Sequence, residues 1–100
     1  MEITIKDKTI TLKRTFRSLI AFESATGHAF NPTTITESIM YFYCVIIASD
    51  TTLEITYDEF MDWLDENPVK LNEFTEWLIS QNKTDEMFAK KKNIKTKKNS

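Results

Sequence analysis

One segment of the sequence, ITESIMYFYCVIIAS at residues 35–49, constrains the fold more than any other. Thr34 and Glu37 have the spacing of a capping box, in which two side chains satisfy free backbone N–H groups where a helix starts. One stripe of the predicted helix is apolar, and further apolar residues cover its opposite side, namely Tyr41, Cys44, Val45 and Ala48. A helix that is apolar nearly all round lies either at the centre of a domain or against a partner.

The composition also favours helices. The chain has one glycine and two prolines, whereas all-β domains of this size need many turn residues. Its 100 residues are enough for one domain, and 41% hydrophobic with 28% charged residues is the balance of a soluble globular protein. The N-terminus lacks the pattern of a secretion signal, and the apolar run at residues 39–48 is far shorter than the roughly 20 residues that cross a bilayer.

The first residues alternate between apolar and polar side chains. The apolar positions are Ile3, Ile5, Ile10 and Leu12. Alternation with a period of two predicts a small antiparallel hairpin with these side chains buried, and we place its connection at Asp7-Lys8.

The segment TFRSLIAFESATG predicts a helix that begins after the N-cap Thr15 and ends at Gly27. Its buried stripe is expected to contain Phe16, Leu19 and Ile20. Glu23 falls inside this apolar arc, where a carboxylate needs a partner, such as Arg14, Arg17 or backbone donors.

Two more helices are expected in the second half of the chain. Thr56 and Glu59 form a second capping box before TYDEFMDWLDEN, and Asn67-Pro68 ends that helix and starts another, which fades by Asn82. The predicted fold class is α+β, mainly α, with an N-terminal β-hairpin followed by about four helices in a compact bundle. We assign residues 1–82 to one globular domain and residues 83–100 to a flexible Lys-rich tail.

Charge is distributed unevenly between these two parts. Residues 1–82 contain 6 Lys/Arg and 13 Asp/Glu, a net charge of 6 − 13 = −7, whereas residues 83–100 contain 7 Lys and 2 acids, a net charge of +5. The tail has too few apolar residues to form a core. Lysine clusters bind nucleic acid through phosphates, but the last aromatic residue, Phe88, precedes the lysine run, so we expect no nucleic-acid partner other than one bound by the tail alone.

Catalysis has little support in the sequence. A nucleophilic pair would have to combine Cys44, in the middle of an apolar helix, with His28, in a loop, and we interpret them as a buried structural cysteine and a surface histidine. Motifs for zinc hydrolases, dithiol sites and nucleotide-binding glycine loops are missing, so we expect no enzyme activity, no cofactor and no metal. The only cysteine excludes an internal disulfide and fits an intracellular protein.

Two surfaces are candidates for protein interaction. The first is on the apolar helix, at Met40, Tyr41, Cys44 and Ala48. The second is the polar face of the following helix, at Asp58, Asp62, Asp65 and Glu66. Each has a simpler alternative, because the apolar residues can belong to the core and the acidic residues can serve solubility.

The order of these elements resembles the small tail assembly chaperones of long-tailed bacteriophages and related prophages. The resemblance covers about residues 2–79, and its most characteristic positions are Phe16, Leu19, Glu23, Gly27, Phe60, Leu64, Asp65 and Pro68. It implies a non-enzymatic chaperone in the cytoplasm of the bacterial host. Such a protein coats the tape measure protein, keeps its hydrophobic helices soluble and is displaced when tail tube subunits assemble.

The sequence leaves alternatives open. The tape measure protein is the expected partner, with tail tube protein and self-association as further candidates. A second interpretation is a small regulatory or inhibitory protein of a mobile element that acts through its acidic face, for example by imitating nucleic acid. Its binding would weaken with salt, whereas the chaperone would bind long helical segments.

Overall fold

The structure, a computed structural model, describes residues 1–28 and 34–81. Its elements in chain order are the strands β1 (Glu2–Ile5) and β2 (Lys8–Thr11), the helices α1 (Phe16–Thr26), α2 (Ile35–Ser49) and α3 (Tyr57–Glu66), and a further helix over residues 69–81. We call the last one the 69–81 helix. The predicted fold class, a β-hairpin followed by about four helices, is confirmed within these residues. The predicted tail at residues 83–100 lies outside them.

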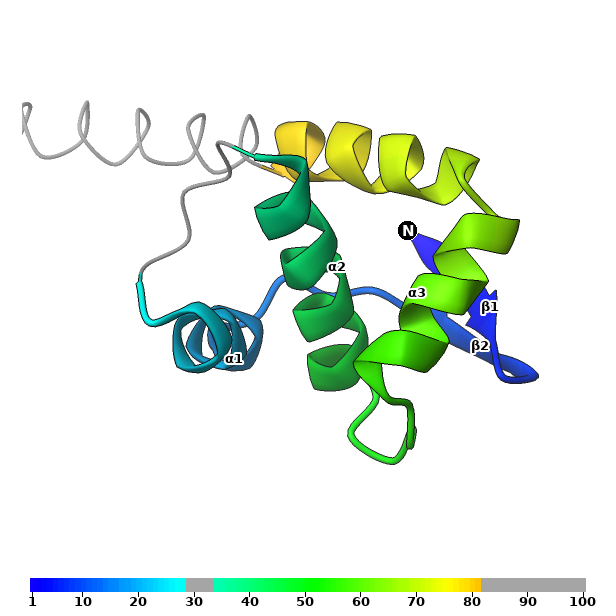
Figure 1. The fold of residues 1–100 in the computed structure, drawn as a ribbon, viewed down its shortest axis with the longest axis horizontal. Helices are drawn as coiled ribbons and strands as arrows, with labels where there is room; N and C mark the ends of the chain where they lie inside the picture. Colours follow the sequence, from blue (N-terminus) through cyan, green and yellow to red (C-terminus); the bar gives the residue numbers. More distant parts are fainter. Residues whose placement is uncertain (29–33, 82–100) are drawn as a thin grey trace, which may run out of the picture.

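The apolar helix α2 is at the centre of the molecule. Figure 1 shows α1 on one side of α2, with α3 and the hairpin on the other side, and the 69–81 helix across one end. Five consecutive or nearly consecutive side chains of α2 are buried, namely Tyr41, Phe42, Cys44, Val45 and Ile46. Of the two alternatives that the apolar sequence left open, a central position or a contact with a partner, the structure shows the central position.

Aromatic rings connect the four helices through α2. The ring of Phe42 stacks on that of Phe74 in the 69–81 helix, with centroids 4.2 Å apart, and meets Phe60 of α3 edge to face at 5.4 Å. Tyr41 meets Phe22 of α1 edge to face at 5.9 Å. All five rings are fully buried. Edge-to-face and offset pairs of this kind add to the stability gained from burying the rings.

The hairpin forms as its alternating pattern predicts. Ile3 pairs with Ile10 across the two strands, and the four predicted apolar residues, Ile3, Ile5, Ile10 and Leu12, are all buried. The turn, however, is Lys6-Asp7, one residue before the predicted Asp7-Lys8. Both turn residues have positive φ, 50° for Lys6 and 63° for Asp7, as a two-residue hairpin loop requires.

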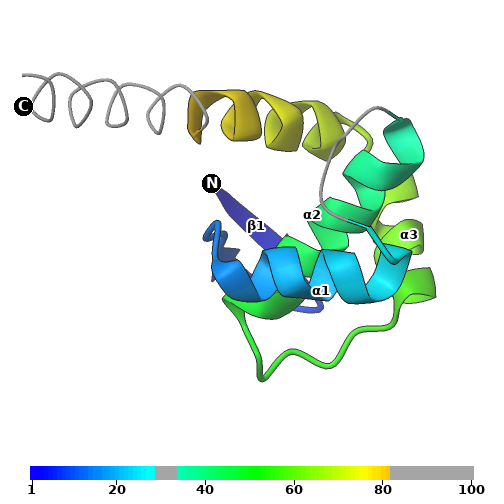
Figure 2. The ribbon, with the colours of Figure 1, turned by 90° about the vertical axis from the view of Figure 1, so that its left-hand side faces the viewer.

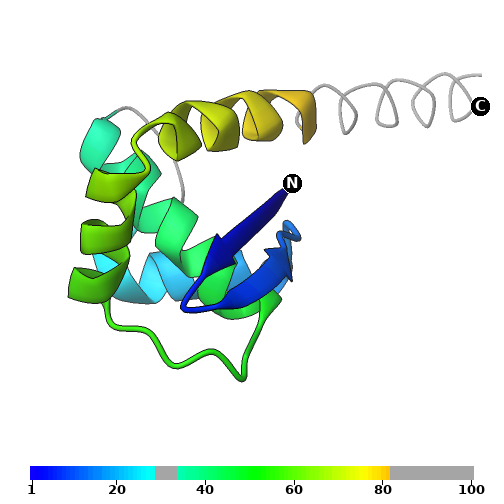
Figure 3. The same ribbon diagram turned by 90° about the vertical axis from the view of Figure 1, so that its right-hand side faces the viewer.

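The hairpin contacts α3 and the residues just before it through the side chains of Lys6 and Trp63. The Lys6 ammonium lies 2.7 Å from the Glu59 carboxylate and donates a hydrogen bond to the carbonyl of Glu54 at 2.9 Å. The indole N–H of Trp63 donates to the carbonyl of Thr4 in β1 at 3.0 Å. In Figure 3 the hairpin faces the viewer and α1 lies behind it, so the two flank α2 from opposite sides.

The predicted caps of α1 are confirmed. Thr15 accepts a hydrogen bond from the backbone N–H of Ser18, and the Ser18 hydroxyl accepts one from the N–H of Thr15, so the two residues form a capping box. At the other end Gly27 has a φ of 81°, and its N–H donates to the carbonyl of Glu23. A left-handed residue at this position is the usual end of a helix and favours glycine.

The two later caps differ from each other. Thr56 and Glu59 form the complete capping box predicted for α3. At α2 only half of the predicted box is present, because Thr34 accepts from the N–H of Glu37 while the Glu37 carboxylate lies 3.3 Å from the Nε2 atom of His28. The Glu37 side chain thereby connects the start of α2 to the end of α1.

The 69–81 helix begins at Val69, one residue after Pro68, which the sequence predicts as its first residue. The Asn67 side chain donates to the carbonyl of Trp63 at 2.8 Å and so completes the end of α3. Phe74 is fully buried, and the other residues of the predicted stripe are half-buried, namely Leu71, Trp77 and Leu78.

Candidate protein-interaction surfaces

The predicted surface on α2 is not exposed as a patch. Tyr41 and Cys44 are buried, with exposed fractions of 0% and 2%, while Met40 and Ala48 are half-buried. The prediction that these four residues offer an interaction surface is therefore wrong for Tyr41 and Cys44. Tyr41 is covered by α1, whose Ser18 hydroxyl lies 3.3 Å from the Tyr41 hydroxyl inside the protein.

Cys44 has the properties of a core residue. Burial raises the pKa of its thiol to about 11, so almost none of it is thiolate at neutral pH. His28, the other member of the only conceivable nucleophilic pair, has a half-exposed ring that contacts Phe22 and Glu37. The two residues thus have different surroundings, one in the core and the other at the surface.

The predicted acidic surface on α3 is exposed. Asp58, Asp62, Asp65 and Glu66 all face solvent. None of these four carboxylates forms an ion pair with another residue in the part of the chain that the structure describes. The Glu59 carboxylate, on the same helix, instead forms an ion pair with Lys6 and accepts a hydrogen bond from the backbone N–H of Thr56. The hydrogen bond from Lys6, followed by that from the Thr56 N–H, lowers the pKa of Glu59.

Helix α1 packs with a different face from the one predicted. Its buried residues are Ser18 and Phe22, whereas Phe16 and Ile20, which we expected inside, are 85% and 62% exposed. Only Leu19 of the predicted stripe is partly buried. The sequence carries two sets of apolar residues on this helix, and the second set, which contains Phe22, docks on α2.

The prediction that Glu23 lies on the buried side of α1 is wrong. Glu23 lies on the same side of α1 as Phe16 and Ile20, and it is exposed. A carboxylate in an apolar arc indicates that the arc faces solvent, so Glu23 needs no buried partner. The expected pairing with Arg14 or Arg17 is not present among the residues that the structure describes.

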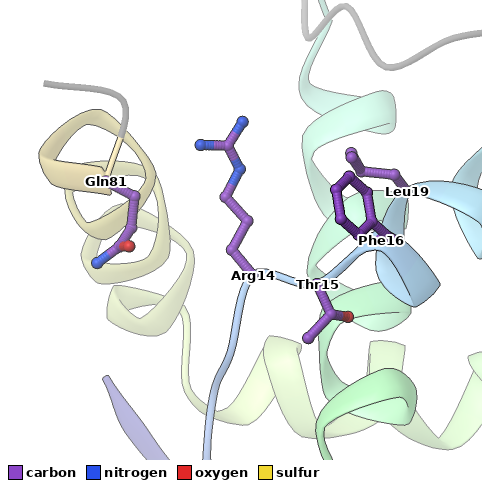
Figure 4. A pocket seen from close by; sticks show the side chains of 5 residues that line it. All are labelled: Arg14, Thr15, Phe16, Leu19 and Gln81. Atoms are coloured by element: carbon purple, nitrogen blue, oxygen red, sulfur yellow. The ribbon is translucent and has the colours of Figure 1, made fainter. Parts of the chain in front are cut away.

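The exposed face of α1 borders a hollow of about 470 Å³. We call Phe16, Ile20 and this hollow the α1 surface. Figure 4 shows Phe16 and Leu19 at the start of α1 on one side of the hollow and Gln81 of the 69–81 helix on the other, with Arg14 extending between them. Figure 2 shows α1 along the outer side of the molecule, with the 69–81 helix above it. The hollow is open to solvent and has an apolar wall and a polar rim.

We also searched the described residues for metal sites and for membrane-spanning helices. Residues 1–28 and 34–81 contain no group of three or more His, Cys, Asp or Glu side chains that could hold a metal ion. Within the same ranges no helix is long and apolar enough to span a membrane. The arrangement offers surfaces for binding, one apolar and one acidic.

Comparison of the chain with protein-family models, curated proteins and solved structures found no match.

Proposed function

We propose that this protein is a tail assembly chaperone, which binds the tape measure protein of a long-tailed bacteriophage or prophage and keeps it soluble while the tail tube assembles. One observation carries the proposal. The two large apolar side chains Phe16 and Ile20 are exposed on one face of α1, one turn apart and beside a hollow, in a domain that has a complete core without them.

An exposed apolar pair of this kind fits a helical client. Apolar residues one turn apart can cover the apolar stripe of another helix, and the hollow can receive one of its side chains. The area is small, so a single contact would be weak. Many copies bound along one long client would still protect it, because linked weak contacts add up to a strong association. The sequence resemblance to tail assembly chaperones supports the same conclusion.

The test is co-expression with the product of the longest open reading frame downstream of this gene. We expect a soluble complex in a pull-down, and a client that is insoluble when it is expressed alone. Phe16→Ser should weaken the complex. Val69→Ser is the matched control, because Val69 is also a large exposed apolar residue in the first turn of its helix but lies outside α1.

Two results would contradict the proposal. One is a long protein that is equally soluble with and without this chain and does not bind it. The other is a complex that forms only with nucleic-acid enzymes and not with the long helical protein. If binding persists in both Phe16→Ser and Val69→Ser, the chaperone function stands and the binding surface lies elsewhere.

A second candidate function rests on the acidic face of α3. Four exposed carboxylates without ion pairs to other described residues could bind a basic protein, as expected of a regulatory or inhibitory protein of a mobile element. Asp62→Lys should then weaken binding strongly, and raising the salt concentration should do the same. In the chaperone, by contrast, Asp62→Lys should change binding of the client less than Phe16→Ser does.

A further inference from the structure

We propose that the α1 surface binds an amphipathic helix of a partner whose apolar stripe is flanked by acidic side chains. This inference deepens the proposed function and rests on it only for the identity of the partner. It names the surface, the secondary structure of the ligand and the sign of its charge.

The first step of the argument is that the exposed apolar pair is not needed to hold α1 in place. Phe22 anchors the helix against Tyr41, and Ser18 is buried beside it. Both ends of the helix have their own caps, at Thr15 and Gly27. Single exposed apolar residues are common on protein surfaces, but two on one face beside a hollow with an apolar wall mark an interaction site.

The second step concerns charge. Residues 1–82 have a net charge of −7, from 6 Lys/Arg and 13 Asp/Glu, yet residues 13–22 (KRTFRSLIAF) contain three cations and no carboxylate. The first turn of α1 has no acidic residue. The part of the α1 surface around Arg17 is therefore positive in an otherwise acidic domain, whereas Glu23, beyond Ile20 on the same side of the helix, is negative.

The third step is that cations elsewhere in the domain are neutralised, whereas two beside α1 are not. Lys6, Lys8 and Lys70 lie within 2.7, 3.2 and 3.0 Å of the carboxylates of Glu59, Asp50 and Glu73. Lys13 and Arg17 form no ion pair with any residue in the described ranges. Arg17 is exposed and follows Phe16 directly on α1, so it stands at the edge of the apolar pair.

These observations together define the ligand. An apolar stripe would cover Phe16 and Ile20 and send one side chain into the hollow, where Leu19 forms part of the wall. Acidic side chains beside the stripe would meet Arg17 and the Arg14 side chain at the rim. Complementary charge at a rim selects the partner and its orientation, while the apolar centre supplies most of the affinity.

The test uses two synthetic peptides of about 18 residues, long enough to form an isolated helix. Both carry the same stripe of Leu and Phe, and the stripe is flanked by Glu in one peptide and by Lys in the other. The full-length protein labelled with ¹⁵N is titrated with each peptide, and amide chemical shifts are followed. We expect the Glu peptide to shift residues 13–22 and Gln81 and to bind about tenfold more tightly than the Lys peptide at low salt.

Variants separate the apolar and the charge contributions. Phe16→Ser should weaken both peptides, with Val69→Ser as the matched control that binds like the wild type. Arg17→Glu should abolish or reverse the preference between the peptides. Lys70→Glu makes the same change of charge outside α1 and should leave the preference unchanged, with a thermal melt of each variant confirming that it folds.

The inference is overturned if the Lys peptide binds as well as the Glu peptide, if the shifts lie on α3, or if neither peptide binds. It is also overturned if the shifts of residues 13–22 change with protein concentration alone, because a second copy would then be the occupant. Failure of the proposed function gives a different pattern, in which the peptides bind at α1 but no complex forms with the tape measure protein.

Discussion

Helices α1 and α3 are of similar length and begin with the same kind of cap, yet their apolar residues are distributed differently between the core and the surface. In α3 the apolar residues Phe60 and Leu64 are buried, and the acidic residues face solvent. In α1 apolar residues point both ways, with Phe22 buried and Phe16 exposed. A helix with one apolar face reveals its packing in its sequence, whereas a helix with two does not reveal which of them packs inside.

The position of the two helices agrees with this difference. They lie on opposite sides of α2, so their outer faces belong to different parts of the surface (Figure 1). The α3 side carries exposed carboxylates, and the α1 side carries an apolar pair with the exposed Arg17 next to Phe16 and with Glu23 beyond Ile20. The molecule therefore has two chemically distinct surfaces, and the experiments on partners can address them separately.

The largest expected effect comes from comparing the loss of a phenylalanine ring on the two faces of α1. Phe22→Ala should lower the free energy of unfolding by about 3–5 kcal/mol, because it leaves a cavity beside Tyr41. Phe16→Ala should change it by no more than about 0.5 kcal/mol, because the ring is exposed. Urea denaturation followed by tryptophan fluorescence measures both. If Phe16→Ala were the more damaging variant, the packing face of α1 would be the one first expected from the sequence.

Removing the N-cap side chain should lower the free energy of unfolding by the same amount in α1 and in α3, although the two helices bury their apolar residues differently. Thr15→Ala and Thr56→Ala should each lower the free energy of unfolding by about 1 kcal/mol, because each removes the side chain that satisfies a backbone N–H at the helix start. Thr75→Ala is the control, since the hydroxyl of this exposed residue binds only the Leu71 carbonyl within its own helix. A cost limited to one of the two caps would show that the helices do not form by the same local rules.

The sequence predicted those features that depend on neighbouring residues. The ends of α1 and α3 follow from their caps, and the buried side of the hairpin follows from the alternation of Ile3, Ile5, Ile10 and Leu12. The central position of α2 follows from its apolar surface. In each case the information lies within a few positions along the chain.

The features that the sequence did not predict depend on residues far apart along the chain. Which apolar set of α1 packs inward is decided by its docking on α2, where Ser18 meets Tyr41, 23 positions further on. The turn lies at Lys6-Asp7, and neither version of the turn contains a glycine that would have marked it; the contact of Lys6 with Glu59 of α3 lies 53 positions away in the sequence. The candidate site on α1 was missed for the same reason, although Glu23 marked the exposed side.

A smaller effect is expected from the carboxylate that fastens α3 to the hairpin. The hydrogen bond from Lys6 lowers the pKa of Glu59 from its usual 4.5 in the folded protein. The unfolded chain therefore binds a proton at a higher pH than the folded protein does. The stabilisation is complete above about pH 4.5 and is lost as the pH falls through the lower, folded-state pKa.

Glu59→Gln should therefore have a melting temperature that falls less steeply than that of the wild type when the pH is lowered from 6 to 3, as measured by circular dichroism. Lys6→Gln should flatten the curve in the same direction, because it removes the cation from the same pair. Equal slopes in the wild type and in both variants would show that the Lys6–Glu59 ion pair adds nothing to stability.

The smallest effect is expected from replacing Glu23, an exposed carboxylate on α1. Glu23 lies on the exposed side of the helix, and its carboxylate forms no hydrogen bond or ion pair with any residue in the described part of the chain. Glu23→Gln should consequently leave the melting temperature at neutral pH unchanged within about 2 °C. A larger decrease would mean that the carboxylate is buried and paired, and the face with Phe16 and Ile20 would then pack inside. Because Glu23 and these two residues share one side of α1, this conservative variant tests which way the helix faces without disturbing the core.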